Sequence, residues 1–320
     1  MILPADAVQD KHKNWHVVIG DSSIIWSCHT DTVHRHGGRQ AVARLGDTLH
    51  LSLTARDSNC LGADDTVGVW LCLEMIAAGV PGRYIFHYGE ERGGLGSTPL
   101  TRDPEWRETL SQYRACIALD RMDRHDVITH QGWQRCCSDV FANSIADILA
   151  IEDHRLTYKP DDGGIYTDSA EYIDLIGECT NLSVGYFAQH SRGEWVDLQH
   201  VERLRDALIG ADWSALVYAR AAGEIDERDW GAAGGWGGHY RDDYTPRYAD
   251  DDSRFLTAEE ISWSRELAEH GYKWDDDPLS DDPINVERLK RRIALDQEYC
   301  YYCDNGGCVY CNHGSSPYGG

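Results

Sequence analysis

Two kinds of segment alternate along the first 220 residues of this chain. Short runs rich in β-branched and aromatic residues predict strands at residues 15–19, 23–28, 84–86, 116–119 and 180–186. Longer apolar or amphipathic segments predict helices at residues 66–78, 104–113, 136–151 and 196–220. Two further runs, 41–45 and 48–53, flank Gly46-Asp47 and predict a β-hairpin. This alternation predicts an α/β fold, a three-layer sandwich around a mostly parallel central sheet.

Chemically active side chains follow several of these strands or lie where a strand leads into a helix. They are His29, Asp31, Asp64, Glu90, Glu91 and Asp120. Ligands of parallel sheets bind at the carboxyl ends of the strands, so we expect a functional site there. Glu90 and Glu91 come just before three glycines that can turn the chain. One carboxylate could then hold a metal while the other acts as a general base; a solvated acidic turn is the alternative.

Composition narrows the class of protein. The net charge of −24 over 320 residues argues against nucleic acid or an anionic membrane as a main partner, because both are polyanions. The sequence has no apolar run long enough to span a membrane, and its first residues lack the profile of a signal peptide. Eleven cysteines without an export signal predict reduced thiols and a cytoplasmic location.

Five short motifs in this order resemble those of the co-catalytic di-zinc exopeptidases, a clan that includes peptidase T and the lidless aminopeptidases. The motifs are His29-Thr30-Asp31, Leu61-Gly62-Ala63-Asp64-Asp65-x-x-Gly68, Gly89-Glu90-Glu91-x-Gly93, Ala118-Leu119-Asp120 and Gln189-His190-Ser191-x-x-Glu194. Each motif alone could be an ordinary polar turn or helix cap. The resemblance covers residues 10–220 and implies a hydrolase, a metallopeptidase that acts on a small peptide or an amino-acid-derived substrate.

The resemblance implies a role for each matched residue. Two zinc ions would be bound, one by His29 and Asp120, the other by Glu91 and His190, with Asp64 bridging both. Glu90 would be the catalytic base that activates a bridging water. Asp31 would orient His29, and the peptide bond between Asp64 and Asp65 would be cis.

Spacing indicates which branch of the clan the chain resembles. His29 and Asp64 are 35 residues apart, and Asp120 and His190 are 70 residues apart. Neither interval is long enough for an inserted domain, so no lid domain is expected. Loops such as 121–133 and 159–169 would then hold the substrate, with Thr167-Asp168-Ser169 as a candidate rim segment. Residues 1–222 would form the catalytic domain.

The chain changes character after residue 222. Residues 223–298 form a predicted acidic linker, rich in Gly, Trp and Asp, with weakly ordered segments and short helices. Residues 299–320 carry four cysteines at the paired spacing of a zinc knuckle: Cys300, Cys303, Cys308 and Cys311. We expect one structural zinc there, with free thiols as the alternative. A protein partner is a further expectation for this partly disordered tail.

Two other functions remain open at this point. One is a deacylase of N-acyl amino acids or other amides that uses the same metals. The other is a binding or adaptor protein in which the α/β domain is a scaffold and the acidic tail carries the function.

Overall fold

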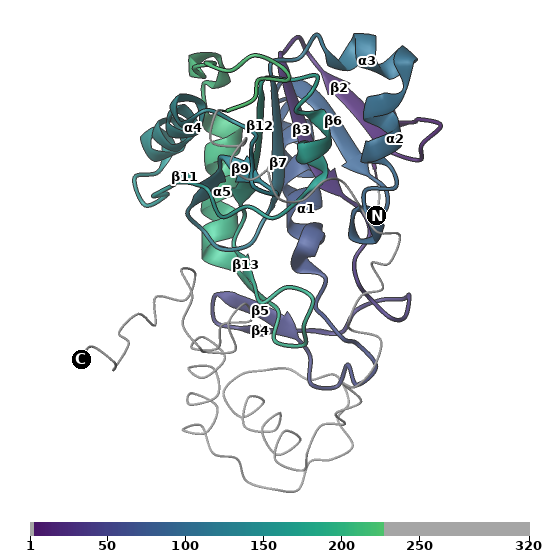
Figure 1. Ribbon diagram of the computed structural model, residues 1–320. Helices are drawn as coiled ribbons and strands as arrows, with labels where there is room; N and C mark the ends of the chain where they lie inside the picture. Colours follow the sequence, from purple (N-terminus) through teal and green to yellow (C-terminus); the bar gives the residue numbers. More distant parts are fainter. Residues whose placement is uncertain (1–2, 227–320) are drawn as a thin grey trace, which may run out of the picture.

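The computed structural model describes residues 3–226. Residues 227–320 are outside the described part of the chain (thin grey trace in Figure 1). The predictions of the acidic linker and of the cysteine zinc knuckle at Cys300, Cys303, Cys308 and Cys311 fall there almost entirely. They therefore stay predictions, as does the domain boundary at residue 222.

An eight-stranded sheet runs through the centre of the molecule (Figure 1). Its strands follow the order β1 (Val8–Gln9), β2 (Trp15–Ile19), β6 (Gly82–His87), β3 (Ile24–His29), β7 (Ala115–Arg121), β12 (Glu178–Ser183), β8 (Asp126–Ile128) and β11 (Lys159–Asp161). The four central strands, from β6 to β12, are parallel to one another. β2 joins one side of this group antiparallel, and β8 joins the other side antiparallel.

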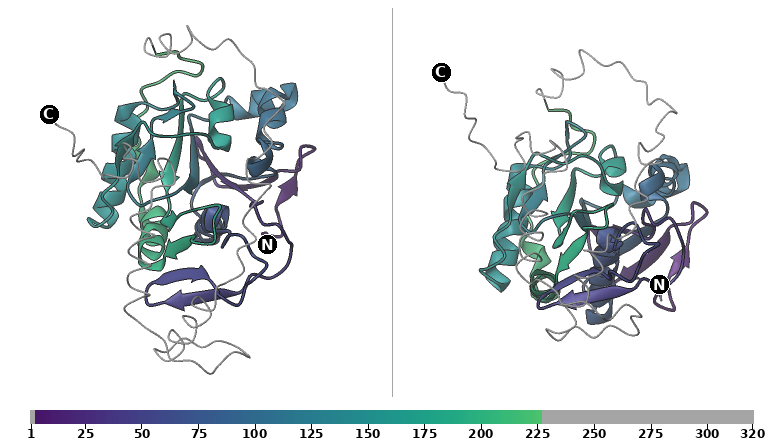
Figure 2. Two further views of the ribbon diagram at one scale, coloured as in Figure 1. Left: turned by 60° about the horizontal axis from the view of Figure 1, so that its bottom comes forward. Right: turned by 90° about the horizontal axis from the view of Figure 1, so that it is seen from below.

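Helices cover both faces of the sheet and complete the three layers (Figure 2). One face carries α1 (Ala63–Ala78), α4 (Asp139–Glu152) and α5 (Leu198–Gly210). The other face carries α2 (Ser97–Arg102), α3 (Pro104–Leu110) and the 3-10 helix η2 (Asp168–Tyr172). The predicted α/β sandwich with a mostly parallel sheet is confirmed.

Side-chain alternation along the central strands explains why two cores form. Trp26 and Tyr84 point to the core shared with α1, α4 and α5, whereas their neighbours Ile25 and Ile85 point to the core shared with α2, α3 and η2. All four side chains are fully buried. Strands that are buried on both faces read as continuous apolar runs, which is the pattern in the sequence.

A smaller antiparallel sheet lies beyond the carboxyl ends of the central strands (Figure 1). Its strands follow the order β13 (Tyr186–Phe187), β14 (Trp195–Asp197), β5 (Thr48–Leu51) and β4 (Val42–Leu45). β4 and β5 form the predicted hairpin around Gly46-Asp47. A third, two-stranded sheet is made by β9 (His130–Gln131) and β10 (Gln134–Arg135). In residues 3–226, neither interval between the matched motifs holds a separate domain.

One prediction is wrong: the helix expected at 196–220 ends at Gly210, and only the short 3-10 helix η3 (Trp213–Ala215) follows. The side chain of Asp212 accepts a hydrogen bond from the backbone N–H of Ser214, which starts a new turn. Trp213 still packs, with its ring edge-on to Trp26 at 4.8 Å between centroids. Apolar residues therefore recur at helical spacing beyond Gly210, although the helix itself ends there, and this is why the sequence predicted a longer helix.

None of the helices within residues 3–226 combines the length and the apolar character needed to cross a membrane.

Candidate metal centre

The matched residues meet at the carboxyl edge of the central strands. His29 is the last residue of β3, and Asp120 is the penultimate residue of the neighbouring strand β7. Glu90 and Glu91 lie in the 3-10 helix η1 (Glu90–Arg92), which follows β6 on the other side of β3. Because these three strands are parallel, their ends gather polar side chains from three separate parts of the sequence.

Asp64 lies between the two histidines. Its Oδ1 is 2.9 Å from Nε2 of His29, and its Oδ2 is 3.2 Å from Nε2 of His190. Each histidine also has a second carboxylate: Asp120 Oδ1 lies 3.5 Å from His29 Nε2, and Glu91 Oε1 lies 2.8 Å from His190 Nε2. The five residues therefore form two imidazole-carboxylate pairs joined by the carboxylate of Asp64.

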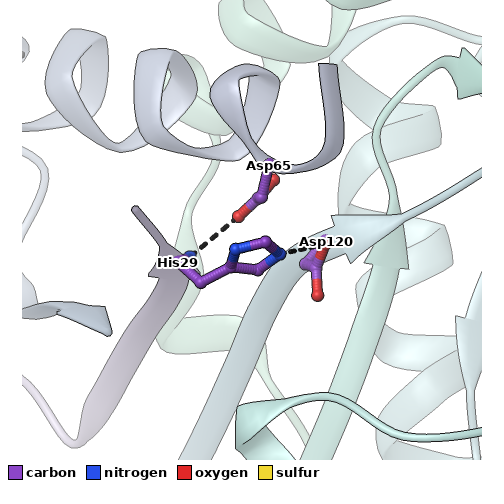
Figure 3. Close-up of side chains that lie close together, drawn as sticks. All are labelled: His29, Asp65 and Asp120. Carbon is purple, nitrogen blue, oxygen red and sulfur yellow. Dashed lines mark hydrogen bonds and ion pairs between the residues drawn. The ribbon is translucent and has the colours of Figure 1, made fainter. Parts of the chain in front are cut away.

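Asp65 is placed differently from Asp64, although the two are adjacent. One of its oxygens accepts the backbone N–H of His29 at 3.0 Å, and the other accepts the backbone N–H of Gly68 at 3.0 Å. Figure 3 shows Asp65 beside His29, with Asp120 on the far side of the imidazole. The peptide bond between Asp64 and Asp65 is cis, as the resemblance predicted. Asp65 thus fixes backbone, while Asp64 faces both histidines.

Gly68 allows this close arrangement at the start of α1. A Cβ at this position would overlap the carbonyl oxygen of Leu119 and would lie 2.5 Å from Oδ1 of Asp65. The strand that carries Asp120 therefore approaches the backbone of α1 more closely than any side chain would permit. This accounts for the glycine three residues after Asp65.

Residue 31 holds His29 through its backbone. His29 Nδ1 lies 2.9 Å from the carbonyl oxygen of Asp31, while the Asp31 carboxylate is 3.7 Å away. That carboxylate instead accepts the backbone N–H groups of Gly89 at 2.9 Å and Glu90 at 3.1 Å. Asp31 therefore links the orientation of His29 to the turn that carries Glu90.

Burial strongly affects the carboxylates of the site. It raises the pKa of Glu90 well above its usual value, and it also raises the pKa of Glu91 and of Asp120. Within the described residues, no hydrogen bond is made to the carboxylate of Glu90. This side chain is therefore free to interact with a small ligand such as water.

The pKa values of the two histidines are set by neighbouring carboxylates rather than by burial. Burial alone would lower the pKa of His29, but the charge and hydrogen bond of Asp120 outweigh it and the pKa is raised well above its usual value. Burial likewise opposes the charge on His190, but hydrogen bonds to Asp64 and Glu91 raise its pKa to about 11. Burial acts to raise the pKa of Asp64, yet the hydrogen bonds from His190 and His29 hold it below the usual range.

These contacts fit a bound cation. Several carboxylates this close together and this deeply buried are costly without a positive charge among them. Potential ligand atoms of His29, Asp65 and Asp120 lie within 4.8 Å of one another, as do those of His29, Asp64 and Glu91. A set of imidazole nitrogens and carboxylate oxygens suits zinc. Since both oxygens of Asp65 already accept backbone N–H groups, Asp64 is the better placed ligand.

The sequence predicted no specific contact at the site for several residues that surround it. Thr167 donates its hydroxyl to Asp120 Oδ2 at 2.7 Å, and the Tyr186 hydroxyl donates to Asp120 Oδ1 at 3.2 Å. Glu194 accepts the backbone N–H groups of Gly62 and Asp64 with its two oxygens. Glu194 belongs to the matched motif around His190, but the sequence assigned it no role.

Asp168 is the least expected of these residues. The segment around it was considered only as a rim loop, but Asp168 is 1% exposed, and neither of its carboxylate oxygens has a hydrogen-bond partner among residues 3–226. Burial raises its pKa to about 7. The sequence gives no signal for this placement, since it depends on how the loop before η2 folds back onto the sheet.

No protein-family model and no curated protein matches the sequence. Solved structures do match the fold. A tripeptidase from Staphylococcus aureus is 12% identical, with a TM-score of 0.51 over 64% of this chain and 87% of that protein. The aminopeptidase PepT from Bacillus cereus is 13% identical, with a TM-score of 0.49 over 64% of this chain and 87% of that one. The resemblance inferred from the motifs is thus confirmed at the level of the fold.

Proposed function

We propose that this protein is a zinc-dependent exopeptidase, an aminopeptidase or a hydrolase of di- and tripeptides. The observation that carries the proposal is the position of Asp64, whose two oxygens face His29 and His190 at 2.9 and 3.2 Å. A carboxylate that bridges two imidazoles, each with its own second carboxylate, is the arrangement expected of a site for two metal ions. The tripeptidase from S. aureus supports the same reading, because it shares the fold.

In this proposal five residues hold the metals. His29 and Asp120 would hold one zinc, Glu91 and His190 would hold the other, and Asp64 would serve both. When bound, the zinc ions would polarise the carbonyl of the scissile bond and favour ionisation of the attacking water. Asp31, Thr167 and Tyr186 would keep the ligands in position through the hydrogen bonds already described.

Glu90 is the proposed catalytic base. It accepts a proton from the water that attacks the peptide carbonyl, and it returns this proton to the nitrogen of the leaving amine as the C–N bond breaks. Two observations support this role: its carboxylate has no hydrogen bond in the described part of the chain, and its backbone N–H is fixed by Asp31. Its neighbour Glu91 is engaged by His190 and is not free for this role.

A deacylase of N-acyl amino acids is the runner-up, because the same metals and base would serve it. A panel of three substrates, assayed with the zinc-loaded full-length protein, separates the two. Ala-Ala-Ala has a free amino terminus, N-acetyl-Ala-Ala-Ala has a blocked one, and N-acetyl-alanine offers only an acyl bond. We expect release of alanine from the first peptide alone. Hydrolysis of N-acetyl-alanine in preference to Ala-Ala-Ala would favour the deacylase.

A non-catalytic adaptor that acts through its acidic tail is the remaining alternative. It predicts no zinc-dependent hydrolysis of any substrate in the panel. For the exopeptidase we propose a cytoplasmic location. The seven cysteines within the described residues are free and buried, which is in keeping with a reducing compartment. A structural zinc and a protein partner in the tail remain proposals from the sequence.

A further inference from the structure

A polar hollow of about 390 Å³ lies between the loop after β3 and the loop after β5. Its lining residues come from 34–41 and 54–58, and they include His34, His36, Arg39 and Arg56. The volume is in the range of sites that bind small ligands. No role has been given to these residues so far, because the loops that carry them have no sequence motif.

Each loop that lines the hollow is connected, along the chain or by hydrogen bonds, to a segment that carries a residue of the proposed metal centre. The first loop begins three residues after Asp31, and its His34 packs against Gly62, where a Cβ would lie 2.6 Å from the imidazole. The second loop leads through Cys60, whose carbonyl lies 3.2 Å from Nε2 of His34, to Asp64. Arg192, two residues after His190, donates to the carbonyl of Ala55 at 3.1 Å and to that of Ser58. The loops that line the hollow are therefore held by direct contacts to the segments that carry Asp64 and His190.

The charge of the hollow is opposite to that of the protein as a whole. Arg39 and Arg56 are exposed in its lining, and neither forms an ion pair within residues 3–226. Asp57 is the single carboxylate among the lining residues. The lining also includes the two neighbouring glycines Gly37 and Gly38, where the backbone is not shielded by side chains. In a chain of net charge −24, such a local cationic surface would attract an anionic group that the rest of the protein repels.

We propose that Arg39 and Arg56 bind a carboxylate of the peptide substrate, outside the scissile bond. This inference rests on the proposed exopeptidase function and names its substrate class: short peptides whose free C-terminal carboxylate reaches the hollow, or peptides with an acidic side chain at the same distance. The guanidinium groups would favour such peptides over neutral ones of equal length.

The test compares Ala-Ala-Ala with its C-terminal amide, which removes only the negative charge. For the zinc-loaded full-length protein, we expect kcat/KM to be about fivefold to tenfold higher for the acid, mainly through KM, since two exposed ion pairs are involved. Ala-Ala-Glu amide should recover part of this preference if an acidic side chain serves equally well. The preference should weaken in 1 M salt, which screens exposed charges.

The double variant Arg39→Gln, Arg56→Gln should reduce the ratio between acid and amide to about one, because neither peptide then finds a guanidinium group in the hollow. Arg44→Gln is the matched control, because Arg44 is an exposed arginine of β4 that faces Asp47 at 4.0 Å outside the hollow. This control should keep the wild-type ratio. A ratio near one in the wild type, or a ratio that the double variant leaves unchanged, would overturn the inference.

A binding measurement separates this inference from the proposed function. Ligand-observed NMR titration of the metal-free protein with the same acid and amide reports on the hollow without any turnover. Tighter binding of the acid, lost in the double variant, supports the hollow even if neither peptide is hydrolysed, and in that case the proposed function fails alone. Equal binding of acid and amide, together with normal hydrolysis of both, contradicts only the inference.

Discussion

The carboxylate of Asp31 accepts a hydrogen bond from the backbone N–H of Glu90 at 3.1 Å. Asp31 was expected to orient His29, and its carbonyl does lie against that imidazole. Its carboxylate, however, fixes the turn that presents the proposed base. The proposed ligand His29 and the proposed base Glu90 thus share one anchoring residue, which lies two positions after His29 in the chain.

Replacing Asp31 tests this anchoring role. Asp31→Ala removes the acceptor for two backbone N–H groups, and we expect kcat to fall by about 10- to 100-fold with little change in KM. Asp31→Asn keeps an oxygen that can accept both hydrogen bonds, so its loss should be smaller. Steady-state kinetics on Ala-Ala-Ala measure both variants. Equal losses for Ala and Asn would contradict an anchoring role that depends on these hydrogen bonds.

Asp64→Asn and Asp65→Asn form a matched pair of variants that tests which aspartate binds metal. Asp64→Asn removes the carboxylate shared by His29 and His190, so the zinc content of the purified protein should fall from two ions to at most one. Asp65→Asn should leave the zinc content nearly unchanged, because its oxygens accept backbone N–H groups. The Asp65 variant should instead lose about 2 kcal/mol of unfolding free energy. Elemental analysis and urea unfolding measure the two effects.

The reverse result would assign the ligand to the other aspartate. If Asp65→Asn lost zinc while Asp64→Asn kept it, the proposed bridging role of Asp64 would be wrong.

The sequence predicts the sheet and the edge where the site lies, because buried parallel strands are apolar throughout and end in polar residues. His29 and Asp120 were located in this way. The positions of Thr167 and Asp168 could not be predicted, since they depend on a loop that folds back over the ends of the strands. The same holds for Arg39 and Arg56, whose loops lack any periodic pattern.

Stability should depend on pH through His200. Burial lowers the pKa of this histidine to about 4, below the usual value of 6.5, and its Nε2 lies 3.0 Å from the hydroxyl of Tyr158. As the pH falls below 6.5, the unfolded chain takes up a proton that the folded protein does not bind until about pH 4. The contribution of neutral His200 to stability is therefore complete above pH 6.5 and is lost progressively between pH 6.5 and 4.

Urea unfolding of the metal-free protein at pH 7 and pH 5 tests this linkage. Between these values, wild type should lose about 2 kcal/mol more unfolding free energy than His200→Gln. The exposed His154 offers a control, and His154→Gln should behave as wild type. A His200→Gln variant with the wild-type pH dependence would refute the assignment.

The most direct test of the proposed mechanism is the paired measurement of zinc content and turnover in wild type and Glu90→Gln. Because Glu90 is the proposed base and not a ligand, the variant should keep the zinc content of wild type while its kcat on Ala-Ala-Ala falls by at least about 100-fold. Glu108→Gln, an exposed glutamate of α3, should match wild type in both measurements. A Glu90→Gln variant that holds zinc and turns over at the wild-type rate would contradict the account.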